Sequence, residues 1–158
     1  MFRSNASSFA KQLENCYQKK IEEAATRVFK TARFVHKSLI DKTPVWEGVT
    51  VRNYIMTIGT PYAGVLPEIG GVPTGRTNQM PLGTEPRRAE NAAAALESGS
   101  VLTKVNAFSK IYITNNSDSV SGLEHGELPG DGYTPRSPNG MFGITLEEAL
   151  SRLNSKAL

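Results

Sequence analysis

Two histidines, His36 and His125, are the first candidates for a catalytic or metal-binding role. His125 follows Glu124 and precedes Glu127, and these imidazole and carboxylate groups could contribute ligands to a metal ion. A zinc site usually needs three or four ligands, and no further histidine or cysteine lies near this group in the sequence. His36 falls next to an apolar stripe, which is typical of a histidine at a helix surface or core edge. The sequence therefore predicts no metal site.

Phosphate binding, covalent catalysis and acid–base catalysis also lack a complete set of residues. The glycine-rich run 70–77 resembles a phosphate-binding loop only superficially, because it lacks the Gly-Lys-Ser/Thr ending and its proline removes a backbone donor. Cys16, the only cysteine, has no evident partner that would activate it as a nucleophile. No two carboxylates are arranged as a general acid and base. We expect no catalytic residue, no cofactor and no enzymatic activity.

Length and charge indicate one domain, residues 1–158, with a basic N-terminal element. A single cysteine excludes an intramolecular disulfide and fits folding in a reducing cytoplasm. We expect no signal peptide and no membrane span, because the chain lacks apolar runs of the required kind. Residues 1–43 hold nine Lys and Arg against four Asp and Glu, whereas the rest is mildly acidic. The basic element could face nucleic acid or an acidic partner, or it could be a solvated helix face.

A long helix is predicted for the first 43 residues. Pro44 ends this helix, because the residue before a proline is pushed out of the helical region. Apolar residues recur along it at spacings of three and four, which puts them on one helix face. These residues are Phe9, Leu13, Tyr17, Ile21, Ala24, Val28, Ala32, Val35 and Leu39. Charged residues, most of them basic, stand between them, so the helix is amphipathic with a largely basic outer face.

The rest of the chain predicts an α+β fold. We expect a small, mostly antiparallel β-sheet, short middle and C-terminal helices, and long Gly/Pro-rich loops after the long N-terminal helix. Runs rich in β-branched and aromatic residues predict strands over residues 49–58 and 110–114. A third, short strand is predicted over residues 120–123.

Two further helices are predicted. The alanine-rich stretch 87–97 favours a helix that Gly99 is positioned to stop. A last helix is predicted to begin at Thr145, which would serve as its N-cap, with Glu148 as the partner in a capping box. This helix would end at about Leu153.

The segment from Gly59 to Pro86 is long and rich in glycine and proline, which is unusual for a simple connection. It also contains apolar side chains that an exposed loop would not need. The simplest explanation for these side chains is that they are buried against a neighbouring subunit or a neighbouring ring. The candidate inter-subunit residues are Leu66, Ile69, Val72, Met80 and Leu82.

Five blocks of sequence, taken in order, resemble the neck and tail-completion proteins of tailed bacteriophages, over roughly residues 20–153. After the long helix come a Thr-Pro-Val-x-x-Gly turn, an Arg-Asn-aromatic strand, an Ile-Thr-Asn-Asn strand, a Leu-Glu-x-Gly element and a Pro-x-Gly-Met turn. The matching positions are Thr43, Pro44, Gly48, Arg52, Asn53, Tyr54, Thr114, Asn115, Asn116, Leu123, Glu124, Gly126, Pro138, Gly140 and Met141. Taken singly, each could be an ordinary turn residue. Trp46 and Glu47 stand where the family commonly has Asp-Thr.

The resemblance implies a structural virion protein without catalysis. It implies a homo-oligomeric, six-fold ring in the neck that contacts neighbouring portal, adaptor or head-closure and tail proteins. Genomic DNA would pass through its lumen without sequence-specific contacts, and no membrane is implied. The chain would be made in the host bacterial cytoplasm and end in the virion. The alternatives are a tail terminator or head-closure ring subunit, a nucleic-acid-binding module that uses the basic helix, and an enzyme.

Overall fold

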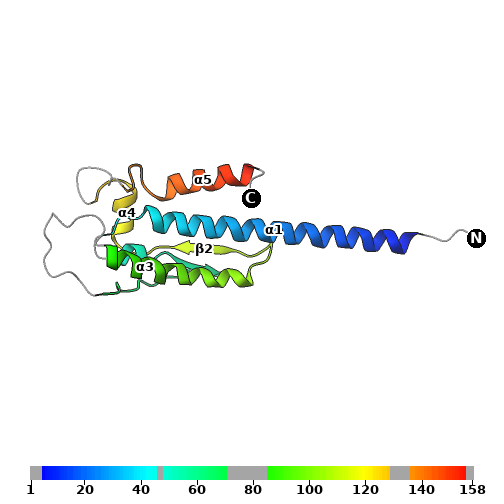
Figure 1. The fold of residues 1–158 in the computed structure, drawn as a ribbon, viewed down its shortest axis with the longest axis horizontal. Coiled ribbons are helices and arrows are strands. Elements are labelled where there is room, and N and C mark those ends of the chain that lie inside the picture. The colour runs from blue at the N-terminus through cyan, green and yellow to red at the C-terminus, as the bar shows by residue number, and fades with distance from the viewer. Residues whose placement is uncertain (1–4, 46–47, 71–84, 129–135, 156–158) are drawn as a thin grey trace, which may run out of the picture.

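The computed structural model describes residues 5–45, 48–70, 85–128 and 136–155 of the chain (Figure 1). In chain order its elements are α1 (Ala6–Lys42), α2 (Val49–Arg52), β1 (Ile55–Ile58), α3 (Glu85–Glu97), the 3-10 helix η1 (Ser98–Lys104), β2 (Ile111–Thr114), α4 (Ser119–Glu124) and α5 (Phe142–Asn154). The predicted α+β class, with a long N-terminal helix and a small antiparallel sheet, is confirmed.

Helix α1 has 37 residues, which makes it about 55 Å long at 1.5 Å per residue. Its C-terminal half lies between α5 on one side and the sheet and α3 on the other, whereas its N-terminal half extends beyond the rest of the fold (Figure 1). The buried residues of α1 all lie near its C-terminus: His36, Leu39 and Ile40. The apolar stripe predicted from the sequence is therefore divided into a covered part and an uncovered part.

The sheet has two antiparallel strands, with Ile55 of β1 opposite Thr114 of β2 and Ile58 opposite Ile111. The second predicted strand is confirmed to within one residue. Helix η1 packs against β1, and α3 packs against α2 and α1. The sheet and these helices thus support the C-terminal end of α1.

The strand expected over residues 49–58 is wrong in its first half, where the chain forms the single-turn helix α2. Gly48, with a φ of 97°, leads the chain into α2, and Asn53 donates from Nδ2 to the Val49 carbonyl oxygen at 2.8 Å. Val51 is fully buried. The preference of β-branched residues for strands depends on packing, and here packing in the core favours the helical turn.

The third strand expected over residues 120–123 is also wrong, because α4 covers these residues. Val120 and Leu123 are three residues apart, so a helical turn brings both to one face, and both pack against the core. Gly122 is buried in the same turn, where an added Cβ would lie 2.8 Å from the Leu128 side chain.

Helix α5 begins earlier than the sequence indicated. It starts at Phe142, so Thr145 lies inside the helix and is buried rather than standing at the N-cap. The expected capping-box partner, Glu148, instead contacts Lys42 of α1, with 2.6 Å between Nζ and Oε2. The lysine hydrogen bond holds the pKa of the Glu148 carboxyl below its ordinary value. The cap of α5 is supplied from elsewhere in the chain.

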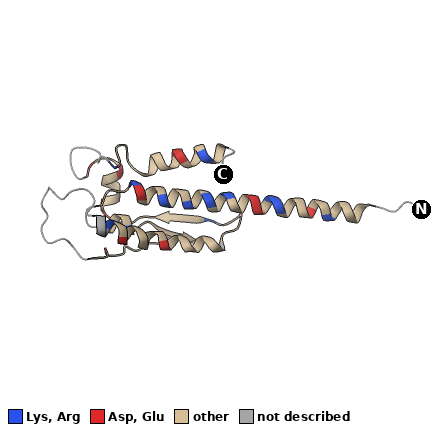
Figure 2. Cartoon of the chain, viewed as in Figure 1, with Lys and Arg blue, Asp and Glu red and all other residues tan. Residues whose placement is uncertain are grey.

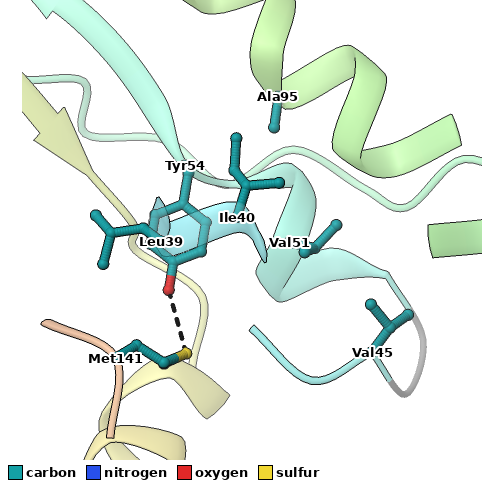
Figure 3. Packing of buried hydrophobic residues seen from close by; sticks show 7 residues of the cluster. All are labelled: Leu39, Ile40, Val45, Val51, Tyr54, Ala95 and Met141. Atoms are coloured by element: carbon teal, nitrogen blue, oxygen red, sulfur yellow. Dashed lines mark hydrogen bonds between the residues drawn. The ribbon is translucent and has the colours of Figure 1, made fainter. Parts of the chain in front are cut away.

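The core lies where the C-terminus of α1 meets α2, α3 and the segment before α5 (Figure 3). Its buried members are Leu39, Ile40, Val45, Val51, Tyr54, Ala95 and Met141. Within the described parts of the chain, no helix is long and apolar enough to cross a membrane.

Candidate functional site

Three residues from separate sequence blocks meet in the core: Thr43, Tyr54 and Met141. Figure 3 shows the Tyr54 hydroxyl directed at the Met141 sulfur. Thr43 Oγ1 lies 3.0 Å from the Tyr54 hydroxyl oxygen and 3.1 Å from Met141 Sδ, and the tyrosine hydroxyl donates to that sulfur at 3.5 Å. Burial of Tyr54 raises the pKa of its hydroxyl above the ordinary value. This network joins the end of α1 to the start of β1 and to the entry of α5.

Glu124 of α4 caps the N-terminus of α5. Its Oε2 accepts from the amide nitrogens of Met141 at 2.6 Å and Phe142 at 2.8 Å, and its Oε1 accepts from that of Gly143 at 3.1 Å. A carboxylate is stabilised there by the free N–H groups and by the helix dipole. Gly140 permits the close approach, because its φ is +84° and an added Cβ would lie 2.7 Å from the Glu124 carbonyl oxygen. The last two blocks of the motif therefore form one capping device.

Two asparagines of the motif fasten the loop that follows β1. Asn53 Nδ2 donates to the Leu66 carbonyl oxygen at 2.8 Å, and the Leu66 amide returns a bond to Asn53 Oδ1 at 2.7 Å. Asn116 Nδ2 donates to the Tyr62 carbonyl oxygen at 2.8 Å. These side chains satisfy the backbone of a segment that belongs to neither strand nor helix.

The expected inter-subunit loop is thus held, in its described part, against its own subunit. Asn91 of α3 bonds the Ile69 amide at 2.9 Å and the Ile69 carbonyl at 3.2 Å. Leu66 and Ile69 are half-buried on the body of the same chain. Outside the described residues lie the other three candidates, Val72, Met80 and Leu82.

The remaining motif positions stand in turns or at the ends of elements. Asn115 Nδ2 donates to the Thr50 carbonyl oxygen at 2.8 Å, which ties the end of β2 to α2. The others are Pro44, Gly48, Arg52, Thr114, Gly126 and Pro138. The motif residues that the structure brings together therefore join the elements of the fold to one another.

Arg88 of α3 completes this framework, although the sequence reasoning did not select it. Its side chain is only 9% exposed. Nη1 donates to the Thr43 carbonyl oxygen at 2.8 Å, and Nη2 donates to those of Ile40 and Asp41, both at 3.1 Å. The guanidinium thus satisfies the last carbonyl groups of α1 and faces the negative end of its dipole. No sequence pattern distinguishes Arg88 from the adjacent Arg87.

The residues considered for metal binding make hydrogen bonds within the chain or are exposed. The Glu124 carboxylate accepts from the backbone of α5, and His125 is exposed, with Nδ1 2.9 Å from the Ser121 carbonyl oxygen. Across the described ranges, no group of three or more His, Cys, Asp or Glu side chains is arranged to hold a metal ion. Cys16 is exposed on α1.

His36 is buried in the core, deeper than the helix-surface or core-edge position that the sequence indicated. Its side chain is 2% exposed, and Nε2 donates to the Tyr54 carbonyl oxygen at 2.8 Å. Burial disfavours the charged imidazolium and lowers the pKa of His36, and this effect outweighs the opposite influence of the carbonyl acceptor.

His36 is expected to make stability fall in mild acid. Because its folded-state pKa lies below the unfolded value near 6.5, the unfolded chain binds the proton more readily. The contribution of neutral His36 to the free energy of unfolding is present above the unfolded-state pKa. It is lost as pH falls below that pKa, by at most about 1.4 kcal/mol per pH unit. Urea denaturation of His36→Gln between pH 7 and pH 5 should show a shallower dependence. The exposed His125→Gln is the matched control, and equal slopes in the wild type and His36→Gln would contradict the assignment.

Lys and Arg recur along the whole length of α1 (Figure 2). The helix carries eight Lys and Arg against four Asp and Glu. Lys30, Arg33 and Lys37 are exposed at spacings of three and four along one face. Such a row favours contact with phosphate groups or with an acidic protein surface.

Apolar side chains are also exposed on two helices. Phe9, Leu13 and Tyr17 of α1 are 67%, 61% and 60% exposed, and three leucines of α5 are at least 39% exposed.

Comparisons of the chain with known protein families, with curated proteins and with solved structures find no match.

Proposed function

We propose that this chain is a structural subunit of the neck of a tailed bacteriophage. Copies of it would form a ring that joins the DNA-filled head to the tail and lines or seals the DNA passage. The chain would act through its surfaces, by assembling with copies of itself and with the neighbouring rings.

The observation that carries the proposal is the convergence of the motif blocks. Thr43 and Met141 are 98 positions apart in the chain, yet their side chains are in contact, and Tyr54 from a third block bonds to both. Glu124 and Gly140, from the last two blocks, form the cap of α5. Chance matches scattered along a sequence would have no reason to contact one another, whereas the shared framework of a family would.

The distribution of exposed side chains supports the same proposal. Half of α1 projects from the fold with apolar residues uncovered (Figure 1), which is typical of a protein–protein contact surface. The basic face of α1 is suited to a DNA duplex that moves past it, because contacts to phosphate groups are independent of base sequence. A tail terminator or head-closure ring would use the same features and is the alternative within this class.

The experiment that tests the proposal is to locate the chain in the particle. Virions of the phage that encodes it would be purified, and the head-to-tail joint would be reconstructed by electron cryomicroscopy. We expect the chain as a closed ring between the head and the tail. Its absence from the joint would exclude the proposed function.

A further inference from the structure

Two apolar stripes on this chain have no partner within the described residues. The first, called here the α1 stripe, consists of Phe9, Leu13 and Tyr17. The second, called the α5 stripe, consists of Leu146, Leu150 and Leu153, which are 60%, 50% and 39% exposed. The spacings of three and four put each set on one side of its helix, and the two sets span almost equal lengths, about 12 Å and about 10 Å.

Further along α1, residues on the same helix face as the α1 stripe already bind α5. Phe34, Ser38 and Lys42 are the residues of α1 that hold α5. Arg152 lies 3.9 Å from the centre of the Phe34 ring, and Glu148 Oε2 lies 3.3 Å from Ser38 Oγ and 2.6 Å from Lys42 Nζ.

Each of these three residues stands 25 positions after one member of the α1 stripe: Phe34 after Phe9, Ser38 after Leu13, and Lys42 after Tyr17. Twenty-five residues make almost seven full turns of an α-helix, so the two sets share one face and lie about 38 Å apart along the axis. The face of α1 that accepts α5 in the C-terminal half therefore continues, uncovered, into the N-terminal half.

The chain's own α5 cannot cover the α1 stripe. Its contacts with Phe34 and Lys42 fix it beside the C-terminal half of α1 (Figure 1), and Leu146, Leu150 and Leu153 lie about a quarter turn round the helix from the buried side that Thr145 and Ala149 occupy. Within the described residues, no other element of the chain covers the α1 stripe.

We propose that the α5 stripe of one copy packs on the α1 stripe of the next copy. The occupant is a second copy of this chain, because the chain itself carries an uncovered helix face of the required length and composition. Charge is compatible with this pairing: Lys20 lies on the α1 stripe face, where its ammonium pairs with the exposed Glu23 of its own helix at 2.7 Å, and Glu147 borders the α5 stripe. An exposed pair of this kind contributes little, so Lys20 can exchange Glu23 for the glutamate of a second copy. The same lysine–glutamate combination, Lys42 with Glu148, joins α1 to α5 within one chain.

The contact is heterologous, since it joins different surfaces of the two copies, and the joined pair keeps one free surface of each kind. Repetition of such a contact gives a closed ring or an open helical array. The inference rests on the proposed ring function for the choice of a second copy, and it specifies which surfaces that ring would use. A contact of three side chains from each copy is small, so covalent trapping is a better readout than size alone.

The native Cys16 makes the contact testable in the full chain. Cys16 is exposed, it is the only cysteine, and it stands three residues after Leu13 at the border of the α1 stripe. Leu150→Cys puts a second thiol in the α5 stripe. Within one chain the two thiols are separated by about 30 Å of helix, since Leu150 lies between the levels of Phe34 and Ser38, and a disulfide needs Cα atoms within about 7 Å.

The purified Leu150→Cys protein would be treated with a mild thiol oxidant at high concentration and run on a non-reducing gel. We expect a ladder of dimers, trimers and larger species, because each chain can link to two neighbours. Wild-type protein and Cys16→Ser/Leu150→Cys, with one thiol each, should stay monomeric. Ser151→Cys, whose thiol lies outside the α5 stripe, is the matched control and should give no ladder.

Adding Leu13→Asp to Leu150→Cys should abolish the ladder without changing the circular dichroism spectrum, because Leu13 lies outside the core. Dimers of the wild type would show that α1 stripes pair with each other and would overturn the proposal, as would the absence of any ladder from Leu150→Cys. The proposed function is tested separately: a ladder from a protein absent from the virion neck would keep the contact and remove the function. A ring in the neck, combined with no disulfide between Cys16 and the thiol of the Leu150→Cys variant, would keep the proposed function and exclude the proposed contact.

Discussion

Replacing Arg88 by methionine is expected to lower the free energy of unfolding by about 3 kcal/mol, because hydrogen bonds to a charged group contribute about 1.5–3 kcal/mol and buried acceptors left unsatisfied add to the cost. The substitution keeps much of the aliphatic bulk but removes the donors to the carbonyl oxygens of Ile40, Asp41 and Thr43. These carbonyl groups end α1 inside the core, where water cannot fully replace the guanidinium. Urea denaturation followed by circular dichroism measures the effect.

Arg88→Lys should be intermediate, because an ammonium group cannot reproduce the fork of donors that the guanidinium provides. Arg33→Met removes an exposed cation from α1 and is the matched control, with an expected change within about 0.5 kcal/mol. If Arg88→Met unfolded at the same urea concentration as the control, the guanidinium would not be the cap of α1.

Glu124→Gln is expected to cost about 2 kcal/mol of stability, since hydrogen bonds to a charged group contribute more than neutral ones. The change preserves the shape of the side chain but removes its negative charge and converts one acceptor into a donor. That donor would then face an N–H group of Met141, Phe142 or Gly143. The loss should appear as a lower denaturation midpoint.

The effect should also be local, with faster hydrogen exchange at the first amides of α5, because these amides lose their acceptor. Glu127→Gln, three residues later and exposed, is the control for removing one carboxylate from this region. Unchanged exchange at the start of α5 in Glu124→Gln would contradict the capping role and leave the Leu-Glu-x-Gly block without a structural explanation.

Regular spacing allowed α1 to be predicted from the sequence, since its apolar residues follow one helical period from Phe9 to Leu39. The same period could not reveal that Leu39 is 2% exposed while Phe9 is 67% exposed. Periodicity identifies residues that share a helix face, but what covers that face depends on where the other elements pack.

Secondary structure predicted from local propensity was wrong where tertiary contacts determine the backbone conformation. Residues 49–52 and 120–123 contain residues typical of strands, yet they form α2 and α4 because Val51, Val120 and Leu123 reach the core from helical turns. Thr145 had the sequence neighbours of an N-cap, but a carboxylate 17 positions before Met141 provides the cap instead. A cap supplied from such a distance leaves no local pattern.

The motif positions were identified from the sequence, whereas the reason for their presence required the structure. Asn53 stood out as part of an expected strand and Asn116 as a turn residue, and each holds the backbone of the loop that follows β1. Their contacts hold the fold together, and the surfaces through which we propose that the chain assembles are the exposed faces of α1 and α5.

The proposed neck ring is tested most directly by a reconstruction of the head-to-tail joint in virions of the tailed phage proposed to carry this chain. We expect a closed ring of repeated copies between the head and the tail. Each copy should match the fold described here, with α5 of one subunit on the N-terminal half of α1 of the next. A single copy per particle, or a joint whose density is filled entirely by other chains, would contradict it.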